Sequence, residues 1–161
     1  MVIPSEINGL PVTYIHEFAF MNCATLTGVV IPATVEDIYW EPFSGCPNLT
    51  SIYFLGNAPA YTASFGINNL TVYYASGTTG WGETFGGFPT EIWLQDSDTN
   101  DLPDWWEIKH FSTLGVNQNS TCSNGINTIR QAYIAGLDPV SETSVLNIEL
   151  ADPKVCNGII W

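Results

Sequence analysis

The sequence predicts a β-rich α/β chain that starts as a short solenoid of stacked coils, followed by a small helical segment and the start of a β domain. Two observations carry this prediction. Residues 12–29 and 35–52 repeat each other at a fixed offset of 23 positions, and an acidic loop at 96–107 separates the repeats from two helix-like stretches. Such a period is typical of a solenoid, in which each coil buries its apolar side against its neighbours.

The repeat is visible at six pairs of positions that are mostly apolar. Each pair is separated by 23 residues: Val12/Val35, Ile15/Ile38, Phe20/Phe43, Cys23/Cys46, Leu26/Leu49 and Val29/Ile52. Alternation at 26–31 and 49–54 predicts two strands whose residues 26, 29, 31, 49, 52 and 54 point into the coil. A shorter third copy follows at 70–74. Because a solenoid offers an extended surface and no built-in pocket, binding is the expected kind of function.

The end of the repeat region is rich in aromatic residues. We expect Trp81, Phe85 and Trp93 to form a plug over the last coil, which has no neighbour to cover it. On the outward side of the strands, Tyr53 with Tyr73 or Tyr74 of the next coil is a candidate exposed aromatic stripe for ligand binding. Ordinary placement of aromatic residues on a sheet is the alternative explanation of these tyrosines.

The segments 15–26 and 38–49 resemble the BspA-type leucine-rich repeat, whose unit is roughly I-x-x-x-A-F-x-x-C-x-x-L-x-x-(V/I)-x-(I/F)-P. The resemblance covers about residues 1–93, including the cap, and departs from the unit at Pro42, where the first repeat has Ala19. It implies a parallel stack of strands on one face. It also implies a bacterial surface or secreted protein that binds other proteins or glycans.

The acidic loop 96–107 has the ligand spacing of an EF-hand-type calcium loop. Position six, normally a glycine with a left-handed backbone, is Asp101, a residue type that tolerates that conformation better than most. The alternative is a solvated acidic linker. The all-oxygen ligand set favours one Ca²⁺ over zinc, with these expected ligands: the side chains of Asp96, Asp98, Asn100, Asp104 and Glu107 and the carbonyl of Leu102.

A second copy of this loop begins 24 residues later, with Gly125 at position six, but it has lost its carboxylates. Its ligand positions are occupied by Ser120, Cys122, Asn124 and Gln131. We expect a helix at 127–135, with Ile126, Ile129, Tyr133 and Ile134 on one face, to pack against the helix that contains Trp105, Trp106 and Ile108. The two copies resemble bacterial thrombospondin type 3-like and dockerin-like repeats, which implies an EF-hand-like helical pair that serves as a calcium-stiffened spacer.

Three units follow from these patterns: repeats with a cap at 1–93, a calcium-loop and helix spacer at 94–139, and the start of a truncated β domain at 140–161. The β domain is expected to contain strands at 145–150 and 159–161. No signal peptide is visible at the N-terminus, which already lies within the repeat pattern. We therefore expect a fragment of a longer secreted or cell-surface protein.

The charge balance excludes one large class of partners. The chain has 3 Lys and Arg against 16 Asp and Glu, a net charge of −13, and its basic residues are scattered. Binding to nucleic acid requires clustered basic residues and is not expected, whereas cationic partners are favoured. No apolar run approaches the ~20 residues of a membrane span. The oligomeric state cannot be predicted from the sequence.

Cysteines and histidines give no sign of catalysis. Cys23 and Cys46 are expected as equivalent inward residues, as free thiols or close enough to bond, and Cys122 and Cys156 are a further possible pair. A dyad of His16 with Cys23 is disfavoured because the matching position beside Cys46 is Tyr39. No nucleophile-elbow, phosphate-loop or paired-histidine metal motif is present.

The sequence therefore predicts a non-enzymatic binding or adhesion protein on the bacterial surface or secreted from it. Its leucine-rich repeats would recognise a protein or a glycan, and a calcium-stabilised spacer would follow. The alternative is an accessory or dockerin-like anchoring region of a larger carbohydrate-active enzyme, which would bind a cohesin.

Overall fold

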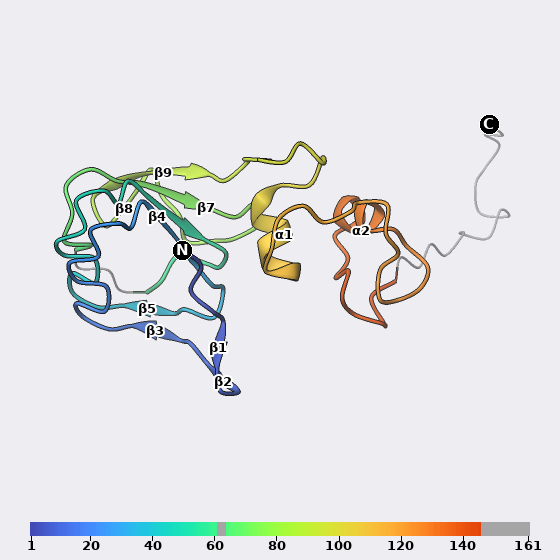
Figure 1. Cartoon of the computed structure of the whole chain (residues 1–161), viewed down its shortest axis with the longest axis horizontal. Coiled ribbons are helices and arrows are strands. Elements are labelled where there is room, and N and C mark those ends of the chain that lie inside the picture. Colours follow the sequence, from blue (N-terminus) through green and yellow to red (C-terminus); the bar gives the residue numbers. More distant parts are fainter. Residues whose placement is uncertain (61–63, 146–161) are drawn as a thin grey trace, which may run out of the picture.

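The computed structural model describes residues 1–60 and 64–145. Within this part of the chain, the backbone winds into a β-solenoid and then continues into two short helices (Figure 1). The expected solenoid architecture is therefore confirmed. The strand expected at 159–161, and all but the first residue of the one expected at 145–150, lie outside the described residues.

The main sheet is a stack of four parallel strands, one from each coil, in the order β4 (Gly28–Ile31), β6 (Ser51–Phe54), β7 (Thr71–Tyr74) and β9 (Phe88–Ile92). β8 (Thr84–Phe85) adds an antiparallel edge to β9. The pairing Val29↔Ile52 keeps the 23-residue offset, whereas Ile52↔Val72 spans 20 positions and Val72↔Thr90 spans 18. The coils therefore shorten toward the cap while their inward residues stay in register.

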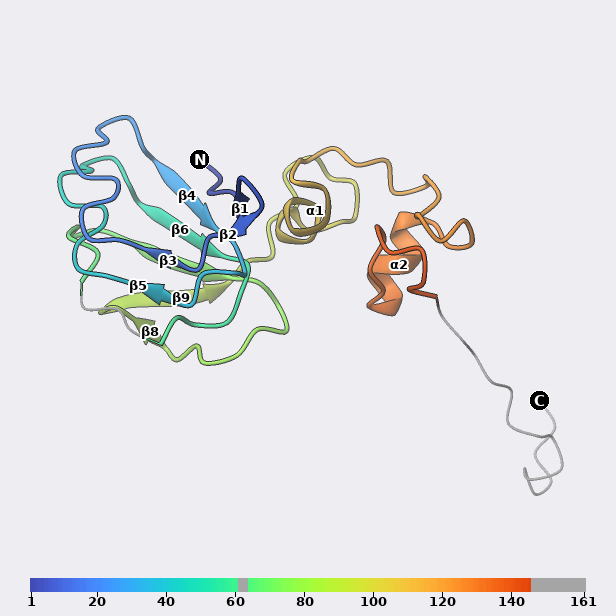
Figure 2. The same ribbon diagram turned by 90° about the horizontal axis from the view of Figure 1, so that it is seen from below.

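A smaller sheet lies on the opposite side of the first two coils (Figures 1 and 2). It pairs β3 (Tyr14–Ile15) with β5 (Asp37–Ile38) in parallel, again at an offset of 23. A short antiparallel hairpin, β1 (Glu6–Ile7) and β2 (Leu10–Pro11), precedes it. The repeat thus produces two sheets that enclose one core.

The core between the two sheets consists of ladders of equivalent residues. Val29, Ile52 and Val72 are fully buried on one side and Ile38 on the other. A ladder of phenylalanine rings fills the turn between the sheets, with ring centroids 5.4 Å apart for Phe20 and Phe43. The inward residues expected from the alternation are all members of this cluster: Leu26, Val29, Ile31, Leu49, Ile52 and Phe54.

The aromatic plug at the end of the solenoid is confirmed for two of its three residues. Trp81 and Phe85 pack against the core, with ring centroids 5.0 Å from each other and 4.9 Å from Trp81 to Phe54. Trp93 is not part of this plug. It follows the last residue of β9, its side chain emerges on the outward side of the sheet, and it belongs to a second core.

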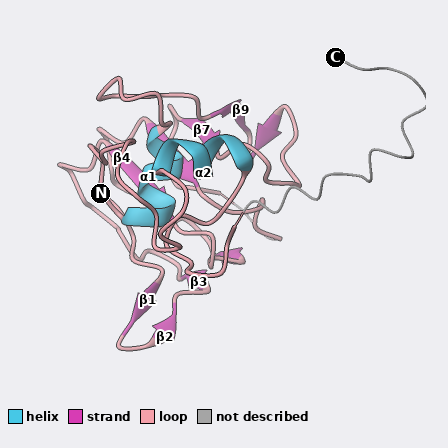
Figure 3. Ribbon diagram, turned by 90° about the vertical axis from the view of Figure 1, so that its right-hand side faces the viewer, coloured by secondary structure: helices cyan, strands magenta, loops and turns pink. Residues whose placement is uncertain are grey.

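The two helices are α1 (Asp104–Phe111) and α2 (Ile129–Ala135) (Figure 3). Thr128 and Gln131 form a reciprocal capping box at the start of α2, and Gly136 ends the helix in a left-handed conformation. The expected apolar face was wrong at Ile126 and Ile134, which are 72% and 71% exposed. Because α2 begins only at residue 129, Ile126 belongs to the preceding loop, and Ile134 lies on the helix face away from Ile129.

A second core joins the helices to the solenoid. It contains Leu55, Ala75 and Trp93, which directly follow the main strands, together with Trp105 and Trp106 of α1. Both helices contribute to this cluster, since Ile129 and Ala132 of α2 belong to it and the ring of Tyr133 lies 5.4 Å from that of Trp106. The EF-hand-like helical pair stays a prediction. Within the described residues, none of the helices has the length and hydropathy needed to cross a membrane.

Replacing Phe43 by alanine should destabilise the solenoid strongly. The ring is fully buried between Phe20 and Phe65, so its removal leaves a cavity and lowers the free energy of unfolding by about 3–5 kcal/mol. Urea unfolding followed by circular dichroism measures this loss. Met21→Ala, at a side chain that is 51% exposed, serves as the control and should change little. A loss below about 1 kcal/mol in Phe43→Ala would contradict the stacked core.

Candidate functional site

The acidic loop 96–107 folds around the carboxylate of Asp96. Its two oxygens accept the backbone N–H groups of Asn100 and Asp101, at 3.2 and 2.9 Å. Asp101 has φ +65°, and Gly125, at the equivalent position of the second loop, has φ +70°. The left-handed backbone expected at position six is therefore present in both loops. The helix expected after the first loop is also present, with Glu107 in its first turn.

The amide of Asn100 lies at the centre of this loop. Its Nδ2 donates to Asp98 Oδ2 at 3.0 Å, to Glu107 Oε1 at 2.9 Å and to the Val116 carbonyl at 3.1 Å. An amide nitrogen has two hydrogens, so it cannot give a full hydrogen bond to all three oxygens. Three oxygens therefore converge on one small volume from the loop, the helix and the segment after the helix.

Glu107 is the most unusual residue of the site. Its side chain is fully buried, Oε1 accepts the N–H of Val116 at 2.8 Å, and Oε2 has no hydrogen-bond partner. Burying a carboxylate oxygen without a partner costs free energy, and such groups in native proteins are usually paired or coordinate a metal. Glu107 is thus a buried carboxylate with a free ligand atom beside Asp98 and Asn100.

Other predicted ligands are occupied differently. Asp104 is buried, but both of its carboxylate oxygens accept hydrogen bonds from Ser97, at 2.7 Å each. The side chain of Leu102 is buried in the second core, and its N–H donates to Asn100 Oδ1. Across residues 1–60 and 64–145, no three His, Cys, Asp or Glu side chains are grouped as a metal site. The calcium site therefore stays a prediction, with the amide of Asn100 standing between Asp98 and Glu107.

The second loop is held together without carboxylates. Asn124 Oδ1 accepts the N–H groups of Ile126 and Asn127, and its Nδ2 donates to the carbonyl of Ser144 at 2.8 Å. Asn100 makes the equivalent contacts with the N–H of Leu102 and the carbonyl of Val116. Each loop therefore uses an asparagine at position five to fasten itself to the segment after its helix.

The two loops are linked to each other by an ion pair. Arg130 Nη1 lies 2.8 Å from Asp101 Oδ2 and also donates to Gln118. Because both partners are about half exposed or more, this pair contributes little to stability. It does bring the only basic residue of the second loop's helix to the rim of the first loop.

The predicted aromatic stripe on the main strands is not an open surface. Tyr53 and Tyr73 stack as expected, with ring centroids 5.0 Å apart, but Trp93 packs 4.5 Å from Tyr53 and both tyrosines border the second core. Burial raises the pKa of the Tyr73 hydroxyl, and the charge of Glu91 adds to this. Tyr74 points to the other side and stacks on Trp81. The structure therefore brings together two of the three candidate residues, half-buried.

Two features of the structure were not predicted from the sequence, one in the acidic loop and one on the smaller sheet. The backbone of Val116 contributes both an N–H and a carbonyl to the acidic loop, and no side-chain pattern signals such a contribution. The rings of Tyr14 and Tyr39 are 57% and 45% exposed on the smaller sheet. Their positions beside the inward pair Ile15 and Ile38 were a signal that the repeat pattern already contained.

The described cysteines, Cys23, Cys46 and Cys122, are free thiols. Cys46 is buried and donates to the Phe20 carbonyl, and burial raises the pKa of its thiol. Cys23, at the equivalent position of the first coil, is exposed, whereas Cys46 is buried. A pair of Cys122 with Cys156 falls outside the described residues.

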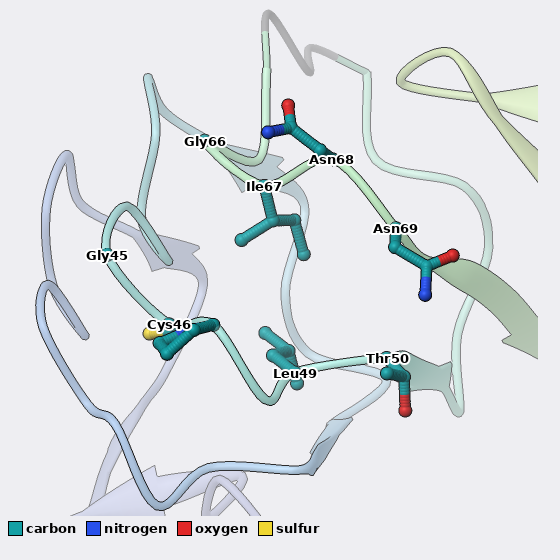
Figure 4. Close-up of a pocket in the computed structure, with 9 residues that line it drawn as sticks. Gly45, Cys46, Leu49, Thr50, Gly66, Ile67, Asn68 and Asn69 are labelled. Atoms are coloured by element: carbon teal, nitrogen blue, oxygen red, sulfur yellow. The ribbon is translucent and has the colours of Figure 1, made fainter.

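The cavities of ligand size that lie away from the acidic loop include two with different linings. One, of about 480 Å³, lies between the turns 45–50 and 66–69 and is bordered by Cys46, Leu49 and Asn69 (Figure 4). The other, of about 420 Å³, lies between the helices and is bordered by Trp106, His110 and Tyr133, among others. Neither contains a nucleophile with a hydrogen-bonded base, so neither has the arrangement of a hydrolytic site.

The comparison with known protein families found a similarity in the solenoid. Residues 5–74 match the family described as BspA type leucine rich repeat region (6 copies). The repeats are therefore similar to those of the BspA type, as the repeat unit indicated. The comparisons with curated proteins and with solved structures gave no match.

The stability of the helical segment should fall on acidification through His110. Burial and the nearby charge of Lys109 lower the pKa of His110 below its usual 6.5, and Asp138, 3.4 Å away, only partly offsets this. The unfolded chain therefore takes up this proton at higher pH than the folded chain. The resulting stability is complete above pH 6.5 and is lost as the pH falls through the folded pKa.

The measurement is the free energy of unfolding of the wild type and of His110→Gln across the pH range from about 7.5 to 5. We expect the wild type to lose more stability than the variant over this range, because the many carboxylates contribute equally to both curves. Parallel curves for the two proteins would contradict the direction of the His110 shift.

Proposed function

We propose that this chain is a non-enzymatic binding protein of the cell surface or the extracellular space, whose repeats recognise a protein or a glycan. The observation that carries the proposal is the stack of BspA-type coils in parallel register, which displays side chains at fixed spacing over both sheets. Solenoids of this kind act through extended surfaces.

We further propose that the loop 96–107 binds one Ca²⁺ and thereby stiffens the segment that follows the repeats. The support is the fit of the residues: Glu107 is fully buried with an unpartnered Oε2, and Asp98 and Asn100 lie beside it. A hard cation would be held by oxygen atoms of this kind. Turning the Asn100 amide would present its oxygen in place of the nitrogen that now lies among three oxygens.

Calcium would act on the position of the helical segment rather than on chemistry. The side chain of Leu102 and the ring of Trp106, which precede Glu107 in the sequence, are buried in the core shared with the solenoid. An ion that fixes the loop would also fix the first turn of α1 against Leu55 and Trp93. The proposed spacer is therefore rigid at its junction with the repeats.

Calcium should bind the chain at one site in the weak extracellular range, with Kd near or below ~10⁻³ M. Calorimetric titration into the wild type and into Asp96→Ala/Asp98→Ala measures this, and the variant should lose the site. With Kd of ~10⁻³ M, 10 mM calcium should raise the free energy of unfolding by about 1.4 kcal/mol.

Two further variants test whether Glu107 is a calcium ligand and provide a control. Glu107→Gln removes the buried charge while keeping the size of the side chain, and it should abolish binding without loss of stability in the absence of calcium. Glu83→Gln removes an exposed carboxylate in the solenoid and should bind like the wild type. Equal calcium binding by the wild type and all three variants would show that the loop is a plain acidic linker. The absence of binding heat, together with an unchanged melting temperature on addition of a chelator, would lead to the same conclusion.

Asp101→Gly should stabilise the folded chain, with or without calcium. Asp101 already adopts φ +65° in this structure, a conformation that costs a residue with a Cβ about 1 kcal/mol and a glycine much less. Relief of this strain should raise the free energy of unfolding by up to about 1 kcal/mol, measured by urea unfolding. Arg130→Gln separates this effect from the loss of the ion pair with Asp101, since it removes the pair and keeps the strain. A lower stability of Asp101→Gly than of Arg130→Gln would contradict the strained conformation of Asp101.

A further inference from the structure

The outward side of the smaller sheet has an exposed cluster of aromatic rings, unlike the half-buried tyrosines of the main strands. The rings of Tyr14 and Tyr39 meet edge to face with centroids 6.0 Å apart, and His16 stacks on Tyr39 at 5.8 Å. Trp40, the next residue, is 55% exposed. Large aromatic side chains that remain exposed together on a rigid element are typical of an interaction surface.

The repeat itself holds these rings in place. Ile15 and Ile38 point into the core as equivalent residues, so their neighbours in sequence point outward in both coils. The backbone N–H of Tyr39 donates to the Ile15 carbonyl at 2.9 Å, which fixes Tyr39 opposite the first coil. The smaller sheet faces away from the main strands (Figures 1 and 2). The cluster is therefore preorganised, which lowers the entropy lost on binding.

Carboxylates surround the rings, and no basic side chain balances them. Asp37 pairs directly with Tyr14 across the two strands, and Glu36 precedes it on an exposed position. Residues 1–93 contain seven Asp and Glu and no Lys or Arg. The ion pairs of the described residues involve only His110 and Arg130, so these carboxylates have no cationic partner within that part of the chain.

Aromatic faces beside unpaired carboxylates recognise cations. A guanidinium or ammonium group gains cation–π attraction over a tyrosine or tryptophan ring and charge-assisted hydrogen bonds from a nearby carboxylate. Arginine matches both needs because its planar group stacks on rings and pairs with carboxylates in a fixed geometry. A neutral glycan could stack on the rings and donate hydroxyl hydrogen bonds to the carboxylates, but it would leave their negative charge unbalanced.

We propose that the outward face of β3 and β5, formed by Tyr14, His16, Asp37 and Tyr39, docks a basic, arginine- or lysine-rich segment of a partner protein. This inference rests on the proposed function as a repeat-based binding protein and names the surface and the class of partner. Complementary charge would speed encounter at low salt, and the rings would supply the short-range contacts.

The test uses the full chain and a synthetic peptide of alternating arginine and glycine, with a second peptide in which glutamine replaces arginine. Fluorescence anisotropy measures Kd at about 0.05 M and about 0.5 M salt. Tyr14→Val/Tyr39→Val removes both rings and keeps residues that suit a strand. Asp37→Asn removes one carboxylate of the face, and Glu91→Gln removes an exposed one on β9 as the matched control.

We expect the arginine peptide to bind the wild type and the glutamine peptide not to bind. The double tyrosine variant should weaken binding roughly fivefold to tenfold and Asp37→Asn roughly twofold to fivefold at low salt, with less than a twofold change in Glu91→Gln. High salt should weaken wild-type binding more than that of Asp37→Asn. Circular dichroism of the variants confirms that they are folded.

Equal binding of the arginine peptide to the wild type and to the double tyrosine variant would overturn the proposal, as would the absence of binding at low salt. A neutral glycan that binds in a salt-independent way and is lost only in the tyrosine variant would assign the face to a glycan instead. The chain could also bind calcium and bind a defined glycan or protein through another surface, but not bind the arginine peptide. This result would support the proposed function and refute only the docking of a basic segment on this face.

Discussion

The parallel registration of one coil on the next is the constraint on which the rest of the structure depends. Val29, Ile52 and Val72 lie side by side at the centre of the main sheet, and Ile15 and Ile38 do the same on the smaller one. No coil could bury these side chains alone, so the hydrophobic stabilisation belongs to the interfaces between coils. The register also decides which residues point outward, and therefore which side chains each face displays.

The helical segment follows the solenoid in the sequence and also buries apolar residues at the ends of its main strands. Leu55, Ala75 and Trp93 emerge where the main strands end, and they would be exposed without the tryptophans of α1. Their burial ties residues 102–135 to the repeats through one apolar cluster. The same packing half-buries Tyr53 and Tyr73, which leaves the smaller sheet, with Tyr14 and Tyr39, as the face where aromatic rings stay accessible. The two sheets of the solenoid thus differ: the helical segment covers part of the main sheet, and aromatic rings stay exposed on the smaller one.

The acidic loop combines local geometry with one contact that comes from elsewhere in the chain. Asp96 organises the loop through the N–H groups of Asn100 and Asp101, as its spacing alone would suggest. Glu107, in contrast, is buried because Val116 and the second core close over it. The second loop repeats the asparagine anchor at Asn124 and omits the carboxylates. A polar amide network is therefore enough to hold such a loop, and the buried carboxylate of the first loop is the feature that this network does not explain.

The sequence by itself determined the elements whose causes are local or periodic. The 23-residue offset predicted the coils and their inward residues, the glycine or aspartate at position six predicted the left-handed turns, and the threonine and glycine around α2 allowed its ends to form. Only the tertiary structure decided that Trp93 lies in the second core, that Tyr53 and Tyr73 are half-buried, and that Glu107 Oε2 has no hydrogen-bond partner. Each of these depends on the packing of α1 at the ends of the main strands. This contact joins segments that are distant in sequence and whose side chains follow no common repeat, so the sequence pattern does not reveal it. Alternation states which side of a strand a residue occupies, but it does not state what covers that side.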